Sequence, residues 1–245
     1  MKNSGKIIII LLIVIISASF VSAGGISPFL NNGFQALFYH AVRIEDTFKG
    51  LNPMGLAREA FENALRSGDE SGEANIMLGM IYQYLDRPGT ALGYYLDFAA
   101  EHPDEVWVYS LIGDMYTDMG LYDDAKRNYS IAVEKAEEDQ VFSQAHLGLG
   151  NIAFMQGEYL QAKEAFEHAL TDSGDLLDAW LSLGKSLYYL EEYDEAIETL
   201  EKAQQLAPHY SPVFYYLGLS YDAAGYEERA KHAFERVEKL NFKGK

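Results

Sequence analysis

Histidine is the residue type in this chain best suited to metal binding or proton transfer, and six histidines are present. Two histidines hold a metal from one helix when they lie three or four residues apart, and no pair here has that spacing. The six are His40, His102, His146, His168, His209 and His232. The chain also lacks the short motifs of zinc proteases, serine hydrolases, phosphate loops and dinucleotide sites. The sequence therefore predicts no catalytic residue, no metal and no cofactor, and the protein is not expected to be an enzyme.

The charge balance is strongly acidic, with 37 Asp and Glu against 19 Lys and Arg and a formal net charge of −18. Binding to nucleic acid needs a basic surface that neutralises phosphates, so this balance disfavours a nucleic-acid partner. The absence of cysteine excludes disulfides, thiolate metal sites and iron–sulfur clusters. A hydrophobic fraction of 49% is ample for a packed core. We expect a folded, acidic protein.

The first 23 residues have the pattern of an export signal. Lys2 and Lys6 precede ten consecutive apolar residues, 7–16, and Ala23, with Val21 two residues before it, suits the cleft of a signal peptidase. The alternative is an uncleaved anchor, because residues 7–23 are just long enough to span a bilayer. Both interpretations place the rest of the chain outside the cytoplasm, either in the periplasm or extracellular medium or anchored to the outer side of the cytoplasmic membrane. Contact with a membrane is expected only through residues 7–23, if they are uncleaved.

A repeat of about 34 residues organises the remainder of the chain. Glycines recur at intervals of 34, 37, 34 and 34 residues, each followed twelve residues later by an alanine and four residues after that by a bulky side chain. The glycines are Gly79, Gly113, Gly150, Gly184 and Gly218, the alanines Ala91, Ala125, Ala162, Ala196 and Ala230, and the bulky residues Tyr95, Tyr129, Phe166, Leu200 and Phe234. Apolar residues in two runs per repeat, spaced by three and four, predict two amphipathic helices.

The small residues predict how these helices pack. A glycine or alanine lets a neighbouring helix approach closely, and the bulky residue fills the adjacent gap, so the two helices of a repeat should interlock in antiparallel fashion. Gly120, Gly157 and Gly225 lie between the helices, where a left-handed helix stop is expected. Ser211 before Pro212 is typical of an N-cap followed by proline at the first helical position. One repeat cannot bury its own apolar face, so a single continuous domain is expected.

The residues around the repeat glycine resemble the tetratricopeptide repeat family, whose pattern begins Trp-x2-Leu-Gly-x2-Tyr. The best matches are Phe214-Leu217-Gly218-Tyr221, Trp180-Leu183-Gly184 and Tyr109-Ile112-Gly113-Tyr116. The resemblance implies an all-α fold, a right-handed α-solenoid of antiparallel helix pairs. We expect a signal peptide or anchor at 1–23, a linker and the start of a capping helix at 24–37, and a repeat domain at 38–245. Its repeats run approximately 38–71 (degenerate), 72–105, 106–142, 143–176, 177–210 and 211–244.

The resemblance also implies a concave groove lined by the first helix of each repeat. The family's groove positions, set by their distance from the repeat glycine, fall here on Met80, Tyr84, Trp107, Asp114, Asp118, Gln144, Asn151, Met155, Asp178, Lys185, Tyr189 and Tyr215. Aromatic residues supply anchoring area and carboxylates attract basic groups, so the expected partner is a protein or peptide with apolar or aromatic and basic residues. Phe154 and Tyr188, also at groove positions, are open to a second interpretation as core residues.

Two functions are compatible with these features. The first is a non-catalytic scaffold or adaptor outside the cytoplasm, which binds a peptide segment or a partner protein in the groove. The alternative is a structural or self-associating subunit of an envelope assembly that uses the array ends or the convex face. Lys185 is the one basic residue among the groove positions, which disfavours a clamp for a C-terminal carboxylate.

Overall fold

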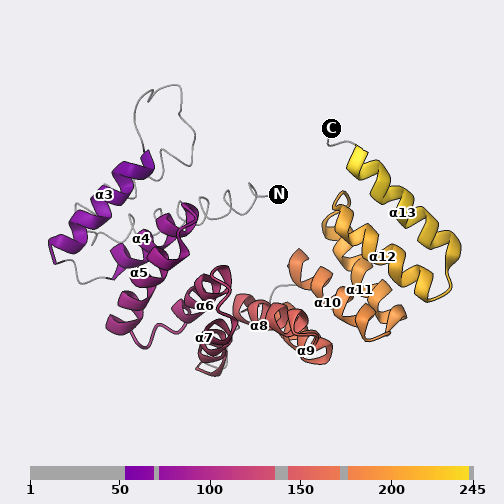
Figure 1. Ribbon diagram of the computed structural model, residues 1–245, viewed down its shortest axis with the longest axis horizontal. Coiled ribbons are helices and arrows are strands. Elements are labelled where there is room, and N and C mark those ends of the chain that lie inside the picture. Colours follow the sequence, from indigo (N-terminus) through magenta and orange to yellow (C-terminus); the bar gives the residue numbers. More distant parts are fainter. Residues whose placement is uncertain (1–52, 69–71, 136–142, 172–175, 243–245) are drawn as a thin grey trace. The chain divides into compact units, whose positions relative to one another are not determined.

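The computed structural model describes residues 53–68, 72–135, 143–171 and 176–242. In this part of the chain the regular structure consists of eleven helices and no strand, which confirms the all-α class (Figure 1). The helices are α3 (Pro53–Arg66), α4 (Glu73–Tyr84), α5 (Pro88–Glu101), α6 (Val108–Asp118), α7 (Tyr122–Glu134), α8 (Ser143–Met155), α9 (Tyr159–Leu170), α10 (Leu177–Tyr189), α11 (Tyr193–Leu206), α12 (Ser211–Ala223) and α13 (Glu227–Phe242). The predicted export segment, the linker and the first part of the degenerate repeat lie outside the described residues.

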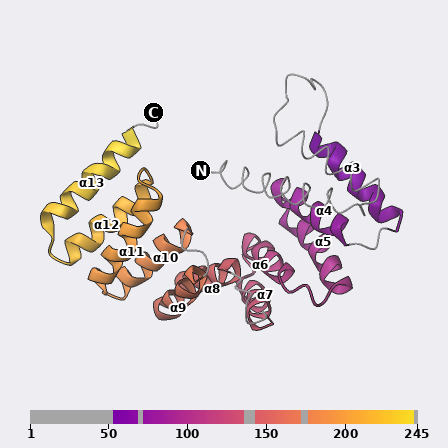
Figure 2. The same cartoon turned by 180° about the vertical axis from the view of Figure 1, so that it is seen from behind.

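The stretch predicted as one repeat domain groups into two compact units, residues 1–121 and 122–245. In the first unit α3 packs on α4, α4 on α5 and α5 on α6. In the second unit each helix from α7 to α13 packs on the next, and both views show α12 and α13 side by side (Figures 1 and 2). Helix α10 also contacts α8 and α12. First helices of successive repeats therefore lie against one another in this unit.

The repeat glycines are notches that receive a ring or branched side chain from the second helix of the same repeat. A Cβ atom built on Gly184 would lie 2.5 Å from Leu200 Cγ, and one on Gly150 would lie 2.5 Å from Phe166 Cε1. The same relationship holds for Gly79 with Tyr95 and for Gly218 with Phe234. Contacts this short leave no space for a side chain at the glycine. The predicted pairing of small and bulky residues sixteen positions apart is confirmed in these four repeats.

Gly148 forms a second kind of notch, which the repeat pattern did not predict. A Cβ atom on this α8 residue would lie 2.4 Å from Cζ of Tyr129, which belongs to α7 and therefore to the preceding repeat. Tyr129 is 2% exposed. The two glycines of α8 thus allow aromatic rings to pack closely on both sides of this helix.

The turn between the two helices of each repeat contains one residue in the left-handed conformation. Gly120, Gly157 and Gly225 have φ values of 75°, 79° and 82°, as predicted. Asp86 and Glu191 occupy the equivalent turns with φ values of 60° and 65°. A side chain with a Cβ atom is strained in this region, whereas glycine is not. The five turns therefore share one backbone geometry, although two of them lack the residue that suits it.

The predicted N-cap at Ser211 is wrong by one residue. Helix α12 begins at Ser211 itself, and Tyr210 occupies the preceding cap position without a side-chain cap hydrogen bond. The backbone N–H of Val213 donates to the carbonyl oxygen of Tyr210 at 3.1 Å, which extends the first turn backward. Helix ends commonly shift by one residue in this way.

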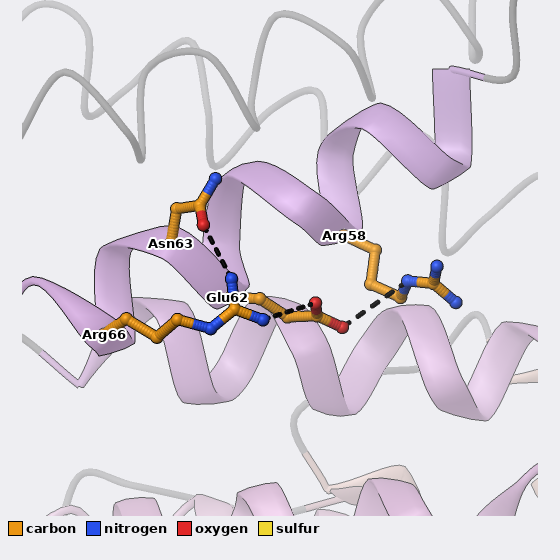
Figure 3. A network of polar contacts seen from close by, with 4 residues as sticks. All are labelled: Arg58, Glu62, Asn63 and Arg66. Atoms are coloured by element: carbon orange, nitrogen blue, oxygen red, sulfur yellow. Dashed lines mark hydrogen bonds and ion pairs between the residues drawn. The ribbon is translucent and has the colours of Figure 1, made fainter.

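Helix α3 carries a small network of charged and amide side chains on its surface (Figure 3). Glu62 lies 3.5 Å from Arg58 and 3.4 Å from Arg66, and Arg66 also donates to Asn63 Oδ1 at 2.7 Å. Charge pairs four residues apart on an exposed helix stabilise it by about 0.3–0.5 kcal/mol each. The network therefore supports α3 locally. No helix in the described part of the chain is both long and apolar enough to span a bilayer.

Candidate binding surface

Seven aromatic side chains from five consecutive helices of the second unit contact one another, and we call them the aromatic cluster. They are Phe154 of α8, Tyr159 of α9, Tyr188 and Tyr189 of α10, Tyr193 of α11, and Tyr215 and Tyr216 of α12. The rings of Tyr159 and Tyr189 are stacked, with centroids 4.8 Å apart and planes 11° apart. Phe154 meets both of these rings edge-on, at 5.4 and 5.6 Å. This geometry matches the electrostatic preference of aromatic pairs.

Tyr188 extends the cluster toward the next repeat. Its ring lies 5.8 Å from Tyr193 and 6.5 Å from Tyr216, and Tyr216 lies 5.4 Å from Tyr215. Burial, followed by neighbouring tyrosines, raises the pKa of Tyr188 and of Tyr216 above the ordinary value of 10.0. Both hydroxyls therefore stay neutral at physiological pH, so they serve as hydrogen-bonding groups on an otherwise apolar surface.

Lys185 places an ammonium group inside the aromatic cluster. Its Nζ lies 4.9 Å from the ring centroid of Phe154 and 5.3 Å from that of Tyr216. Both distances are within the range of a cation–π contact. Burial lowers the pKa of Lys185 from 10.5. The helices α8, α10 and α12 therefore hold one cation between two aromatic faces.

The cluster has a core side and a solvent side. Phe154 and Tyr188 are partly buried and pack against the hydrophobic core that contains Phe166 and Leu187. The interpretation of these two as core residues is thus correct in part, since their rings also contact the cluster. On the solvent side, Tyr189 and Tyr215 are each 46% exposed, and Met155 at the end of α8 is 62% exposed. These three supply apolar area that a partner could cover.

The other predicted residues of the second unit lie on the same helix faces. Asn151 stands one turn before Met155 on α8, and Gln144 lies two turns before Asn151; both are exposed. Asp178 is exposed two turns before Lys185 on α10, so these two also share a face. The predicted positions thus form a stripe on α8 and another on α10, with polar residues at the start and Met155 or Tyr189 at the end.

Three of the predicted residues of the first unit, Met80, Tyr84 and Trp107, are partly buried. Met80 and Tyr84 of α4 are partly buried against the hydrophobic core. Trp107 precedes α6; its ring lies 5.4 Å from Phe98, and its Nε1–H donates to a Glu105 carboxylate oxygen at 2.6 Å. Contacts with Phe98 and Glu105 within the protein therefore hold the Trp107 side chain in place.

Two carboxylates near the end of α6 complete the predicted set. Asp114 is partly buried, whereas Asp118 at the helix end is exposed. Partial desolvation, followed by the nearby charge of Asp86, raises the pKa of Asp118 above its usual 3.8. The negative charge of Asp86, in the turn between α4 and α5, thus repels that of Asp118, and a cation bound nearby would relieve the repulsion.

Three cluster residues were missed by sequence analysis: Tyr159, Tyr193 and Tyr216. Tyr159 and Tyr193 are the first residues of α9 and α11, and each lies three residues before a repeat alanine. Tyr122 has the same position in the preceding repeat, so a tyrosine three residues before the repeat alanine recurs in three repeats. This recurrence could have been found in the sequence. The prediction considered first helices alone, whereas the second helices also deliver rings to the surface.

A stacked pair of imidazoles lies elsewhere in the second unit. His146 and His168 have ring centroids 5.1 Å apart, and burial followed by the neighbouring His168 lowers the pKa of His146. Within the described residues no group of three or more His, Asp or Glu side chains is arranged to hold a metal ion. We assign the pair to packing between α8 and α9.

Comparison with known proteins agrees with this architecture. Two tetratricopeptide repeat family models match residues 111–176 and 177–210. Superkiller complex protein 3 of Mus musculus is 31% identical over 124 residues, which is 45% of this chain and 8% of that protein. The chain therefore spans a small part of the length of this relative.

Two solved structures share the fold over most of their length. The type IV pilus biogenesis factor PilW has a TM-score of 0.72 and 16% identity, covering 90% of this chain and 96% of that one. YrrB, described as a TPR protein with an unusual peptide-binding site, has a TM-score of 0.62 and 18% identity, covering 75% of this chain and 93% of that one. At such identities the likeness establishes the fold alone. Together with the matched repeats, it identifies the chain as a tetratricopeptide repeat protein.

Proposed function

We propose that this protein is a non-catalytic scaffold outside the cytoplasm that binds a peptide segment of a partner protein on the exposed faces of α8, α10 and α12. The observation that carries the proposal is the solvent side of the aromatic cluster. Met155, Tyr189 and Tyr215 are exposed large side chains, and the two tyrosines contact rings that pack against the core. Rigid aromatic anchors lose little conformational entropy on binding, so they give affinity efficiently.

The proposed partner segment combines apolar or aromatic residues with basic ones. The net charge of −18 attracts basic partners over distance and raises their association rate. The repulsion between Asp86 and Asp118 in the first unit offers a local reason as well. A Lys or Arg side chain placed there would remove an unfavourable interaction in addition to making a favourable one.

Location outside the cytoplasm rests on residues 1–23 and remains part of the proposal. An adaptor there would hold partner proteins together in the cell envelope. The array offers repeated, independently variable helix faces, which suits a protein that recognises extended segments.

Site-specific photocrosslinking in native cells tests the groove. A photoreactive phenylalanine analogue is introduced singly at Met155, Tyr189 and Tyr215, and at Glu198 as the control. Glu198 is exposed on α11 and outside the cluster. We expect crosslinks to a different protein from Met155, Tyr189 and Tyr215 and none from Glu198, with the crosslinked peptide identified by mass spectrometry.

Two outcomes would contradict the groove proposal. Equal crosslinking from all four positions would indicate nonspecific contact. Crosslinks between two copies of this chain would instead support the self-associating subunit.

A further inference from the structure

Lys185 has an ammonium group that contacts aromatic rings. Its Nζ contacts the faces of Phe154 and Tyr216. In the described part of the chain, no hydrogen bond or ion pair to a carboxylate reaches this atom, although a lysine ammonium carries three N–H donors. Rings attract the charge but accept N–H bonds poorly. The rings therefore position the ammonium group, and its N–H donors remain open to solvent or to a ligand.

Lys163, in the same unit, is a lysine whose ammonium group is paired with carboxylates. Its Nζ lies 2.6 Å from Glu192 and 3.3 Å from Glu195. The hydrogen bond to Glu192 is the first cause of a raised pKa at Lys163. For Lys185 the direction is opposite, and burial is the cause. The candidate surface thus carries a partly desolvated cation for which the described residues provide no ion pair.

The aromatic faces around Lys185 are already occupied by this internal cation. A partner's Lys or Arg could not stack on Phe154 or Tyr216 without meeting a like charge at short range. A carboxylate, in contrast, would accept N–H bonds from Nζ and restore the electrostatic stabilisation lost by burial. At this one point the surface selects acidic groups, even though the protein as a whole is acidic.

The location of Lys185 also indicates what kind of carboxylate fits. Exposed apolar side chains lie on the helices to either side, Met155 on α8 and Tyr215 on α12, with Tyr189 one turn along α10. A peptide that covers both sides must continue in both directions past the carboxylate. A chain terminus cannot do this, whereas an internal Asp or Glu side chain can.

We propose that Lys185 is a specificity-determining residue that receives the side-chain carboxylate of an internal Asp or Glu in the bound peptide, flanked on both sides by aromatic or apolar residues. This inference rests on the proposed peptide-binding function. The partner peptide expected from both proposals thus contains one acidic residue that binds Lys185, and its basic residues lie elsewhere in its sequence.

Three labelled peptides test this charge preference. Each is a capped nine-residue peptide with a tyrosine on either side of its centre, and the central residue is Glu, Gln or Lys. Fluorescence polarisation at low salt measures the dissociation constants for the full repeat protein. We expect the Glu peptide to bind about tenfold more tightly than the Gln peptide, as for a hydrogen bond to a charged group, and the Lys peptide to bind most weakly.

Lys185→Met separates the charge from the packing, because methionine retains the apolar stem. In this variant the preference for Glu over Gln should disappear, and the Lys peptide should gain affinity because Phe154 and Tyr216 can accept its cation. Lys202→Met is the matched control, because Lys202 is exposed on α11 and its loss changes the net charge equally. This control should retain the wild-type order. Thermal melting of each variant verifies folding.

The outcomes distinguish this inference from the function on which it rests. Equal binding of the three peptides to wild type, or an unchanged Glu preference in Lys185→Met, would overturn the role of Lys185. If Tyr189→Ala still weakened all three peptides in that case, the proposed function would stand. No binding by any peptide to the folded wild-type protein would overturn both.

Discussion

Lys163 Nζ of α9 lies 2.6 Å from Glu192 Oε2, at the turn before α11, so one ion pair joins two successive repeats. Lys163→Met should lower the free energy of unfolding by about 0.5–1 kcal/mol at neutral pH, because the carboxylates remain partly exposed. Urea titration measures the change. Lys202→Met, which removes an exposed lysine from α11, should have a smaller effect.

The same ion pair predicts a pH dependence. The pKa of Lys163 is raised above its ordinary value of 10.5, first by the hydrogen bond to Glu192. A group whose folded pKa exceeds its unfolded pKa contributes stability that is complete below the unfolded value and is lost as pH rises through the folded value. The stability difference between wild type and Lys163→Met should therefore be constant from neutral pH to about pH 9 and shrink above 10.5. A difference that persists unchanged at higher pH would contradict the assignment.

Gly184 and Gly93 respond oppositely to the same substitution. A methyl group at Gly184 would lie 2.5 Å from Leu200 Cγ, so Gly184→Ala should destabilise the fold by about 1–3 kcal/mol through overpacking. Gly93 lies in α5 with nothing within 4 Å of its would-be Cβ, so Gly93→Ala should stabilise by about 0.5–1 kcal/mol through helix propensity. Thermal and urea unfolding of the pair checks both signs, and equal effects would contradict the notch geometry.

Glu191 carries a conformational cost that glycine would avoid. Its φ of 65° matches the turns in which Gly157 and Gly225 stand. Glu191→Gly should raise the free energy of unfolding by about 0.5–1 kcal/mol, because relief of the left-handed strain exceeds the added entropy of the unfolded chain. Glu198→Gly, the same change inside α11, should lower it by about 1 kcal/mol. Destabilisation by both variants would show that side-chain contacts of Glu191 outweigh the strain.

The export segment predicts a defined mature terminus. If residues 1–23 are a cleaved signal, the protein isolated from native cells begins at Gly24, and intact-mass analysis with N-terminal sequencing will detect this. An intact N-terminus in the membrane fraction would support the uncleaved anchor instead. An intact terminus in the cytoplasmic fraction would contradict export altogether.

Helix pairing was predictable because it depends on size alone. A glycine and a bulky residue sixteen positions apart predict a close contact between the two helices of one repeat, and Gly79, Gly150, Gly184 and Gly218 all make it. The Gly148–Tyr129 contact was not predictable from that pattern. It joins different repeats and occurs where a second glycine breaks the regular period.

The binding surface was predictable only in part. Groove positions located Met155, Lys185, Tyr189 and Tyr215 on exposed or partly exposed helix faces. The burial of Lys185 between two rings depends on side-chain directions in three helices, which spacing along one helix does not encode. Trp107 was assigned to the groove because of its position, but its contact with Phe98 and its hydrogen bond to Glu105 hold it in place structurally.

Because the aromatic cluster draws rings from α8 through α12, it spans three repeats that otherwise adhere mainly to their immediate neighbours. A ligand that contacts both Met155 of α8 and Tyr215 of α12 would stabilise the two interfaces between these three repeats. In a linear array the weakest junction sets where fraying starts, and occupancy would strengthen two junctions at once. Partner binding should thus make the thermal unfolding of α8 to α12 more cooperative, so that these repeats unfold together in a sharper transition.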